Sequence, residues 1–177
     1  MQTRSKFGFL VAIVGVMVMG GTVLGTAAPQ DELAQVRRAT AQFHRLEAAT
    51  AAGYELGYVN GLGNRIITGC IANPTYGAMG YHYFNKALID DLVIDPLRPE
   101  GLVYAPGADG GLKLVAVEYV VPGPNSRPAG PAVAPTIFGM QMHILVPQVG
   151  FHTLHAWIWN HNPSGMFAHW NPDVKCT

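Results

Sequence analysis

The segment from residue 112 to residue 121 constrains the fold most, because it is apolar on both faces of a predicted β-strand. Alternate side chains of a strand point to opposite sides. A strand with two apolar faces is expected in the centre of a sheet, so the one acid in this segment, Glu118, is predicted to be buried. Leu114, Ala116 and Val120 share its face, and Val115, Val117, Tyr119 and Val121 form the other.

Four further runs have the composition of short strands and are separated by connections rich in proline and glycine. Residues 106–111 are typical of a hairpin turn that leads into the 112–121 strand. Residues 122–135 contain five prolines and predict a long surface loop. Residues 85–100 contain one short predicted helix. The four strand-like runs span residues 77–84, 102–104, 138–146 and 151–159.

Residues 31–52 precede these runs and predict one long helix. Leu33, Val36, Phe43 and Leu46 recur at helical spacing, and Gly53 follows as a stop signal. The single apolar stripe favours packing on a sheet. The chain therefore predicts an α+β fold, with an N-terminal helix packed on a mostly antiparallel curved sheet or open barrel. A β-sandwich or jelly roll with an added helix is the alternative.

Residues 1–28 have the pattern of a secretory signal peptide, with a basic start, an apolar run over residues 7–18 and small residues before the expected cleavage site. An uncleaved N-terminal anchor is the alternative. Cleavage would leave residues 29–177 as a single secreted domain, located in the periplasm or outside the cell envelope. No stable membrane insertion is expected after cleavage.

The two cysteines, Cys70 and Cys176, are expected to form a disulfide, because export places them in an oxidising compartment. A cysteine-ligated metal is the alternative, but no CxxC spacing supports it. Charged residues make up 12% of the chain, against a usual ~25%. Without the two basic residues of the signal peptide, nine basic residues stand against eleven acidic ones. No basic patch remains for nucleic-acid binding.

Three predicted strands each carry one polar side chain in apolar surroundings, namely His82, Glu118 and His155. A buried polar group is costly unless it has a partner. Two imidazoles and one carboxylate form a ligand set for a transition metal such as copper, iron, zinc or manganese, with positions left open for water or substrate. His143 is a candidate fourth ligand. Glu118 is also the candidate catalytic residue, as a ligand or as a general base.

Each of these residues also has a structural interpretation. A lone histidine on an apolar strand can be a core residue that hydrogen-bonds its own neighbours. Glu118 can form an ion pair with Arg65 or Arg98. The remaining histidines of the β-rich region are predicted outside the site, His152 because it points away from His155, and His161 and His169 because they lie in turn-rich sequence expected at the surface.

Together these residues predict an exported metal-binding protein. If it is an enzyme, it is expected to be a metal-dependent oxidoreductase or hydrolase acting on a small molecule or carbohydrate. Trp157 and Trp159 continue the face of His155 and, with Tyr83, are candidates for substrate binding; core packing is the alternative for the two tryptophans. One competing hypothesis is a metal-free secreted ligand-binding protein with an aromatic-lined pocket. Another is a structural envelope protein.

Several motifs, spread over nearly all of residues 29–177, also occur together in one family. They are GC at 69–70, MGYHY at 79–83, PEGLVY at 99–104, LVAVEY at 114–119, LHAWIW at 154–159, NPSGMF at 162–167 and WNP at 170–172, with Cys176 last. In this combination the chain resembles a family of uncharacterised secreted bacterial proteins. The resemblance implies export but no particular reaction.

Overall fold

The computed structural model describes residues 29–146 and 150–176. Its N-terminal part is helical but is not the single helix predicted for residues 31–52. Helix α1 (Pro29–Thr40) is followed by a 3₁₀ turn, η1 (Ala41–His44), and by α2 (Leu46–Ala51). The chain breaks at Arg45, which is extended at φ −92° and ψ 115°. The break is favoured by tertiary packing, because Tyr104 donates its hydroxyl hydrogen bond to the carbonyl of Phe43.

Six strands form the main sheet in the order β1-β5-β6-β7-β11-β10, and β4 adds to β5. All of the strand pairs are antiparallel and the sheet does not close into a barrel, so the predicted α+β class is confirmed. Strand β7 lies between β6 and β11, which confirms its predicted central position. The bounds are β1 Tyr54–Leu56, β4 Ile71–Asn73, β5 Gly77–Asn85, β6 Gly101–Pro106, β7 Leu112–Pro122, β10 His143–Val146 and β11 Phe151–Ala156.

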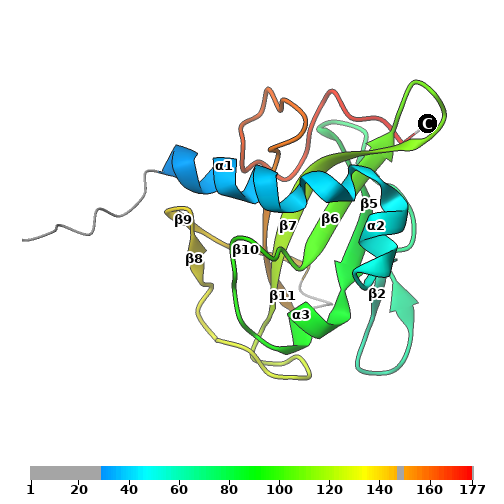
Figure 1. Cartoon of the computed structure of the whole chain (residues 1–177). Coiled ribbons are helices and arrows are strands. Elements are labelled where there is room, and N and C mark those ends of the chain that lie inside the picture. The colour runs from blue at the N-terminus through cyan, green and yellow to red at the C-terminus, as the bar shows by residue number, and fades with distance from the viewer. Residues whose placement is uncertain (1–28, 147–149, 177) are drawn as a thin grey trace, which may run out of the picture.

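The two faces of the sheet are covered differently. The helices α1 and α2 lie across one face (Figure 1) and bury a core that includes Val36, Leu102, Tyr104 and Leu154. The opposite face is covered by the chain between β1 and β4, by Ile89 of the segment after β5 and by the tail that follows β11. Two smaller apolar clusters lie there, one around Val103 and Trp157 and the other around Phe84, Val120 and Phe151.

Two predicted strands are shorter in the structure than in the sequence pattern. The run 138–146 is interrupted because Phe138 and Gly139 have positive φ angles, at 54° and 73°. They form a hairpin between the short strands β8 (Thr136–Ile137) and β9 (Met140–Gln141), and β10 begins at His143. The run 151–159 ends as a strand at Ala156. The backbone N–H of Trp157 instead bonds the carbonyl of Met166.

The segments that connect the strands agree with the prediction. Strands β6 and β7 form a hairpin in which Pro106 pairs with Leu112. Residues 123–135 contain no helix or strand. The short helix expected within residues 85–100 is α3 (Lys86–Asp90), capped by the side chain of Asn85, which accepts from the N–H groups of Ala87 and Leu88. A second two-stranded unit pairs β2 (Tyr58–Val59) with β3 (Arg65–Ile66).

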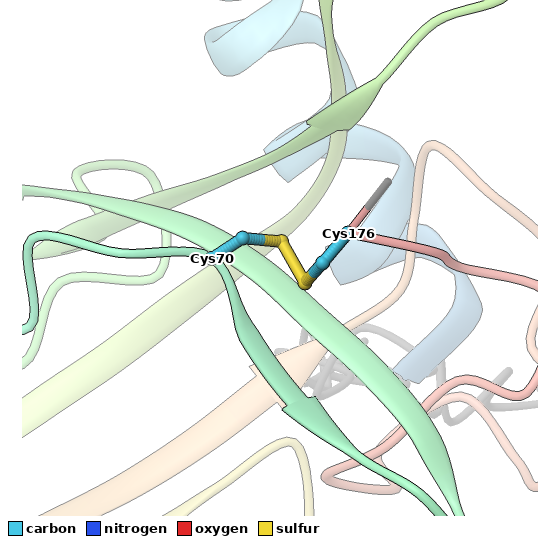
Figure 2. The surroundings of a disulfide bond; sticks show 2 residues. All are labelled: Cys70 and Cys176. Atoms are coloured by element: carbon cyan, nitrogen blue, oxygen red, sulfur yellow. A yellow bond between two sulfur atoms is a disulfide. The ribbon is translucent and has the colours of Figure 1, made fainter.

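The predicted disulfide between Cys70 and Cys176 is present, with the two Cα atoms 5.6 Å apart. Figure 2 shows that it joins the segment before β4 to the C-terminal tail. The predicted signal peptide, residues 1–28, lies outside the described residues. Within the described residues, none of the helices combines the length and the apolar character needed to cross a bilayer.

Candidate metal centre

The sheet brings His82 of β5, Glu118 of β7 and His155 of β11 to the face opposite the helices. His155 and Glu118 are direct partners across β7 and β11. His82 is two strands away from Glu118, with β6 between them. The residue of β6 that pairs with Glu118 is Gly101. A Cβ atom at Gly101 would lie 3.1 Å from Cβ of Glu118 and 3.2 Å from the ring of Phe84, so the missing side chain leaves room for Glu118 and Phe84 side by side on this face.

The potential ligand atoms of these residues converge on one point. The two Nε2 atoms of His82 and His155 are 3.3 Å apart. Glu118 places Oε2 3.7 Å from His82 Nε2 and Oε1 3.8 Å from His155 Nε2. Ligand atoms held by one ion at ~2.0–2.2 Å and at tetrahedral angles are roughly 3.3–3.6 Å apart. The spacing therefore fits a group that could hold a metal ion.

Burial makes each of these groups favour its neutral form in the metal-free protein. The exposed fraction is 3% for His82, 3% for Glu118 and 0% for His155. Desolvation lowers the pKa of His82 to about 4 and that of His155 well below its usual value. Desolvation, with a smaller contribution from nearby Glu100, raises the pKa of Glu118 to about 8. A bound cation would reverse the shift of Glu118, since a nearby positive charge favours the carboxylate.

The structural alternative for Glu118 is not supported. Arg65 pairs with Glu55, and Arg98 pairs with Asp95. Glu118 Oε2 has no hydrogen-bond partner among the described residues. An unpartnered carboxyl oxygen at this depth is costly. A cation in the centre would satisfy it.

Aromatic neighbours orient both imidazoles. The ring of His82 stacks on Phe84, with centroids 5.8 Å apart, and that of His155 stacks on Trp157 at 6.1 Å. The backbone requires a glycine at Gly80, on the same face as His82, because its φ is 118° and a Cβ there would lie 2.4 Å from the carbonyl oxygen of Tyr104.

His143, the candidate fourth ligand, lies outside the group formed by His82, Glu118 and His155. It is exposed on β10, and its ring packs against that of His169, with the two ring centroids 4.9 Å apart. The ring centroid of His169 in turn lies 6.2 Å from that of His155. The turn-rich sequence around His169 predicted a surface position, but this residue is only partly exposed because the C-terminal tail folds back over the sheet.

The aromatic residues proposed for substrate binding lie elsewhere. Tyr83 and Trp159 pack in the cluster on the helix side, where Trp159 Nε1 donates to Thr40 Oγ1. Tyr83 points there by strand alternation, and Trp159 does so because the chain leaves the strand after Ala156. Trp157 is on the His155 face but is buried, and its Nε1 donates to the carbonyl of Ala168.

An apolar pocket of about 210 Å³ opens directly onto His82 and Glu118. Neither tryptophan of the 151–159 run contributes to it, and the tryptophan in its wall is Trp170 of the C-terminal tail. Strand periodicity could not identify Trp170, because it lies in irregular chain. The other lining residues are Ile67, Ile71, Met79, Phe84, Val120, Phe151 and Thr153.

Glu100 is a second buried carboxylate, which the sequence pattern did not single out. It is 1% exposed and accepts a hydrogen bond from the backbone N–H of Val120 at 3.0 Å. Because β6 begins only at Gly101, this carboxylate substitutes for a strand partner of Val120. Desolvation raises the pKa of Glu100 from 4.5 to about 8.

We expect the metal-free protein to lose stability between pH 6.5 and pH 8. A carboxyl group with a raised pKa binds more protons in the folded state than in the unfolded state between 4.5 and about 8, so rising pH disfavours folding. The lowered histidine pKa values act only below 6.5, where falling pH destabilises the fold. Each carboxyl contributes on the order of 1 kcal/mol per pH unit.

Glu100→Gln keeps an acceptor for Val120 and removes the titration. The variant is expected to lose about half as much stability as the wild type between pH 6.5 and pH 8, since Glu118 still titrates. Urea unfolding with a chelator present measures this, and Glu47→Gln, at an exposed position, is the control. An unchanged pH slope in Glu100→Gln would show that Glu100 is ionised in the folded protein.

Comparison of the chain with protein-family profiles, with curated proteins and with solved structures finds no match in any of the three. The functional assignment therefore depends on the geometry and chemistry of the site.

Proposed function

We propose that this protein binds one divalent transition-metal ion through His82, Glu118 and His155. The observation that carries the proposal is the convergence of three buried side chains, each of which places a ligand atom within 4.8 Å of the other two. The two Nε2 atoms are 3.3 Å apart, and each lies 3.7 or 3.8 Å from one oxygen of Glu118. Two imidazoles and one carboxylate suit zinc or iron, and an imidazole-rich site also suits copper. Because the protein supplies three ligands, a bound ion keeps at least one position for water or substrate.

This arrangement also supports a proposal of catalytic use. An ion bound there would act as a Lewis acid or would lower the pKa of a bound water molecule, as in a metal-dependent hydrolase or oxidoreductase. The chain's own contribution is to hold the ligands on strands of one sheet and to surround them with apolar side chains that exclude bulk water. Within the site Glu118 serves as a ligand, since both of its oxygens face the histidines.

We also propose that the protein functions after export. The Cys70–Cys176 disulfide supports this, because such bonds persist in oxidising compartments and are rare in the cytosol. Fractionation of producing cells checks it, and a protein found only in the cytosol with both thiols reduced would contradict it.

Elemental analysis of protein purified without a His tag tests the metal site. We expect close to one equivalent of a transition metal per wild-type chain, and a loss of most of it in His82→Ala and in His155→Ala. His161→Ala is the matched control, because His161 is exposed and outside the cluster. Circular dichroism verifies that each variant is folded. The proposal fails if folded wild-type protein takes up no metal after dialysis against zinc, copper or ferrous iron.

A further inference from the structure

We propose that the pocket beside His82 and Glu118 binds a small, uncharged, mostly apolar molecule of about the size of a substituted benzene ring, with one oxygen or nitrogen directed at the metal. The apolar part of this inference stands on the pocket itself. The direction of the polar atom rests on the proposed metal site.

The composition of the pocket wall decides the class of ligand. Among the described residues that line it, Thr153 is polar besides His82 and Glu118, and the rest of the wall is aliphatic, aromatic or methionine. A carbohydrate would lose the hydration of its many hydroxyl groups in such a pocket without regaining hydrogen bonds. An apolar molecule loses nothing comparable and gains from leaving water. The wall therefore favours an apolar ligand over the carbohydrate considered from the sequence.

The size of the pocket sets the size of the ligand. The volume is about 210 Å³. An apolar cavity of roughly 150 Å³ is already large enough to bind benzene. The pocket thus has room for one ring with one or two small substituents.

Two buried polar atoms, on side chains that line the pocket, call for a polar group on the ligand. Glu118 Oε2 and Thr153 Oγ1 both lack a hydrogen-bond partner among the described residues. Both side chains line the pocket. A metal ion satisfies Glu118, and a hydroxyl or amine on the ligand can satisfy the threonine hydroxyl while it binds the ion.

The walls formed by residues 67–71 and by the C-terminal tail are held in place before any ligand arrives. Ile67 has a φ of 60°, a strained conformation for a β-branched residue. Strain of this kind persists where the surroundings impose it and often marks a ligand site. Cys70 lies between Ile67 and Ile71 in the sequence. Its bond to Cys176 (Figure 2) ties this wall to the tail, which also carries Trp170. A wall formed in advance lowers the entropy cost of binding.

Fluorine NMR with two matched probes tests the inference. We expect 4-fluorotoluene to bind the metal-loaded and the metal-free protein alike, because it engages only the apolar wall. We expect 4-fluorophenol to bind the metal-loaded protein at least tenfold more tightly than 4-fluorotoluene, and to lose that advantage when a chelator removes the ion. Glucose at the same concentrations should displace neither probe.

The outcomes separate this inference from the proposed function. If elemental analysis finds no metal but 4-fluorotoluene binds saturably, the apolar pocket stands and the metal-directed orientation is overturned. If 4-fluorotoluene binds neither form, or glucose competes with it, the apolar ligand class is overturned even when metal is present.

Two variants place the probes in this pocket. Ile71→Trp fills the pocket and is expected to weaken 4-fluorotoluene binding at least tenfold, whereas Leu62→Trp, at a position 84% exposed, is expected to leave it unchanged. Thr153→Val has nearly the same shape as the wild type and is expected to weaken 4-fluorophenol more than 4-fluorotoluene. Equal binding to the wild type and to both pocket variants would show that the probes bind elsewhere.

Discussion

We expect saturating zinc to raise the melting temperature of the metal-free protein by roughly 10 °C. A ligand that binds only the folded state stabilises it by ~4 kcal/mol when its free concentration is about 1,000 times Kd. For a chain of this length, ~1 kcal/mol corresponds to about 2–4 °C. The effect is large because the ion satisfies Oε2 of Glu118, which has no hydrogen-bond partner among the described residues.

The zinc shift is also expected to grow between pH 6.5 and pH 8. Glu118 must release its proton to bind the ion, and its pKa in the metal-free protein is about 8. The two histidines are already neutral in this range, because their pKa values are lowered. Zinc affinity therefore rises with pH until Glu118 ionises without help.

Scanning calorimetry with and without zinc measures this stabilisation. His155→Ala is expected to abolish the shift, and His161→Ala to retain it. A comparable shift in His155→Ala would mean that zinc stabilises the protein from another place, and no shift with zinc, copper or ferrous iron in the wild type would remove the basis of the metal site.

The second large effect is expected from removal of the disulfide. Cys70 and Cys176 are separated by 106 positions in the sequence. In the chain-entropy model, a loop of ~100 residues closed by a disulfide stabilises the fold by up to ~4–5 kcal/mol, because the crosslink restricts the unfolded chain. The double variant Cys70→Ala with Cys176→Ala is thus expected to unfold at a lower urea concentration, with a melting temperature lower by roughly 10 °C.

Reductant added to the wild type gives an independent version of this experiment. It is expected to reproduce the loss of stability and to leave the double variant unaffected. The same treatment is expected to weaken binding of 4-fluorotoluene, since the disulfide connects the Ile71 wall of the pocket to the Trp170 tail. A midpoint that does not change on reduction would show that the tail is held by packing alone.

The candidate site was largely predictable because strand periodicity is local. His82, Glu118 and His155 each lie in a run whose alternation indicates which side chains share a face, and all three are buried on one face as expected. The disulfide was predictable because a pair of cysteines in an oxidising compartment has few alternatives. His143 was a reasonable fourth candidate, since it pairs with Thr153 on the same face. It lies on the edge strand β10, however, and its ring nitrogens do not join the group formed by His82, Glu118 and His155.

Residues in irregular chain could not be placed in the same way. Trp159 was assigned to the site by extending the alternation past Ala156, where the strand has already ended. Trp170, Ile67 and His169 contribute to the pocket or to the surroundings of the histidines from loops, which carry no periodic signal. The prediction of one long N-terminal helix was wrong for a related reason. Contacts between residues distant in the sequence favour the break at Arg45 over a continued helix.

The sequence by itself determined the α+β class, the central strand β7 and the identity of three buried polar side chains, because each follows from the alternation or spacing of residues near one another in the chain. Only the tertiary structure decided that these three meet at one point. That outcome depends on the register between strands and on Gly101, where a Cβ atom would crowd Glu118 and Phe84 on the face that holds the site. Register is a property of paired strands, so no single segment contains it.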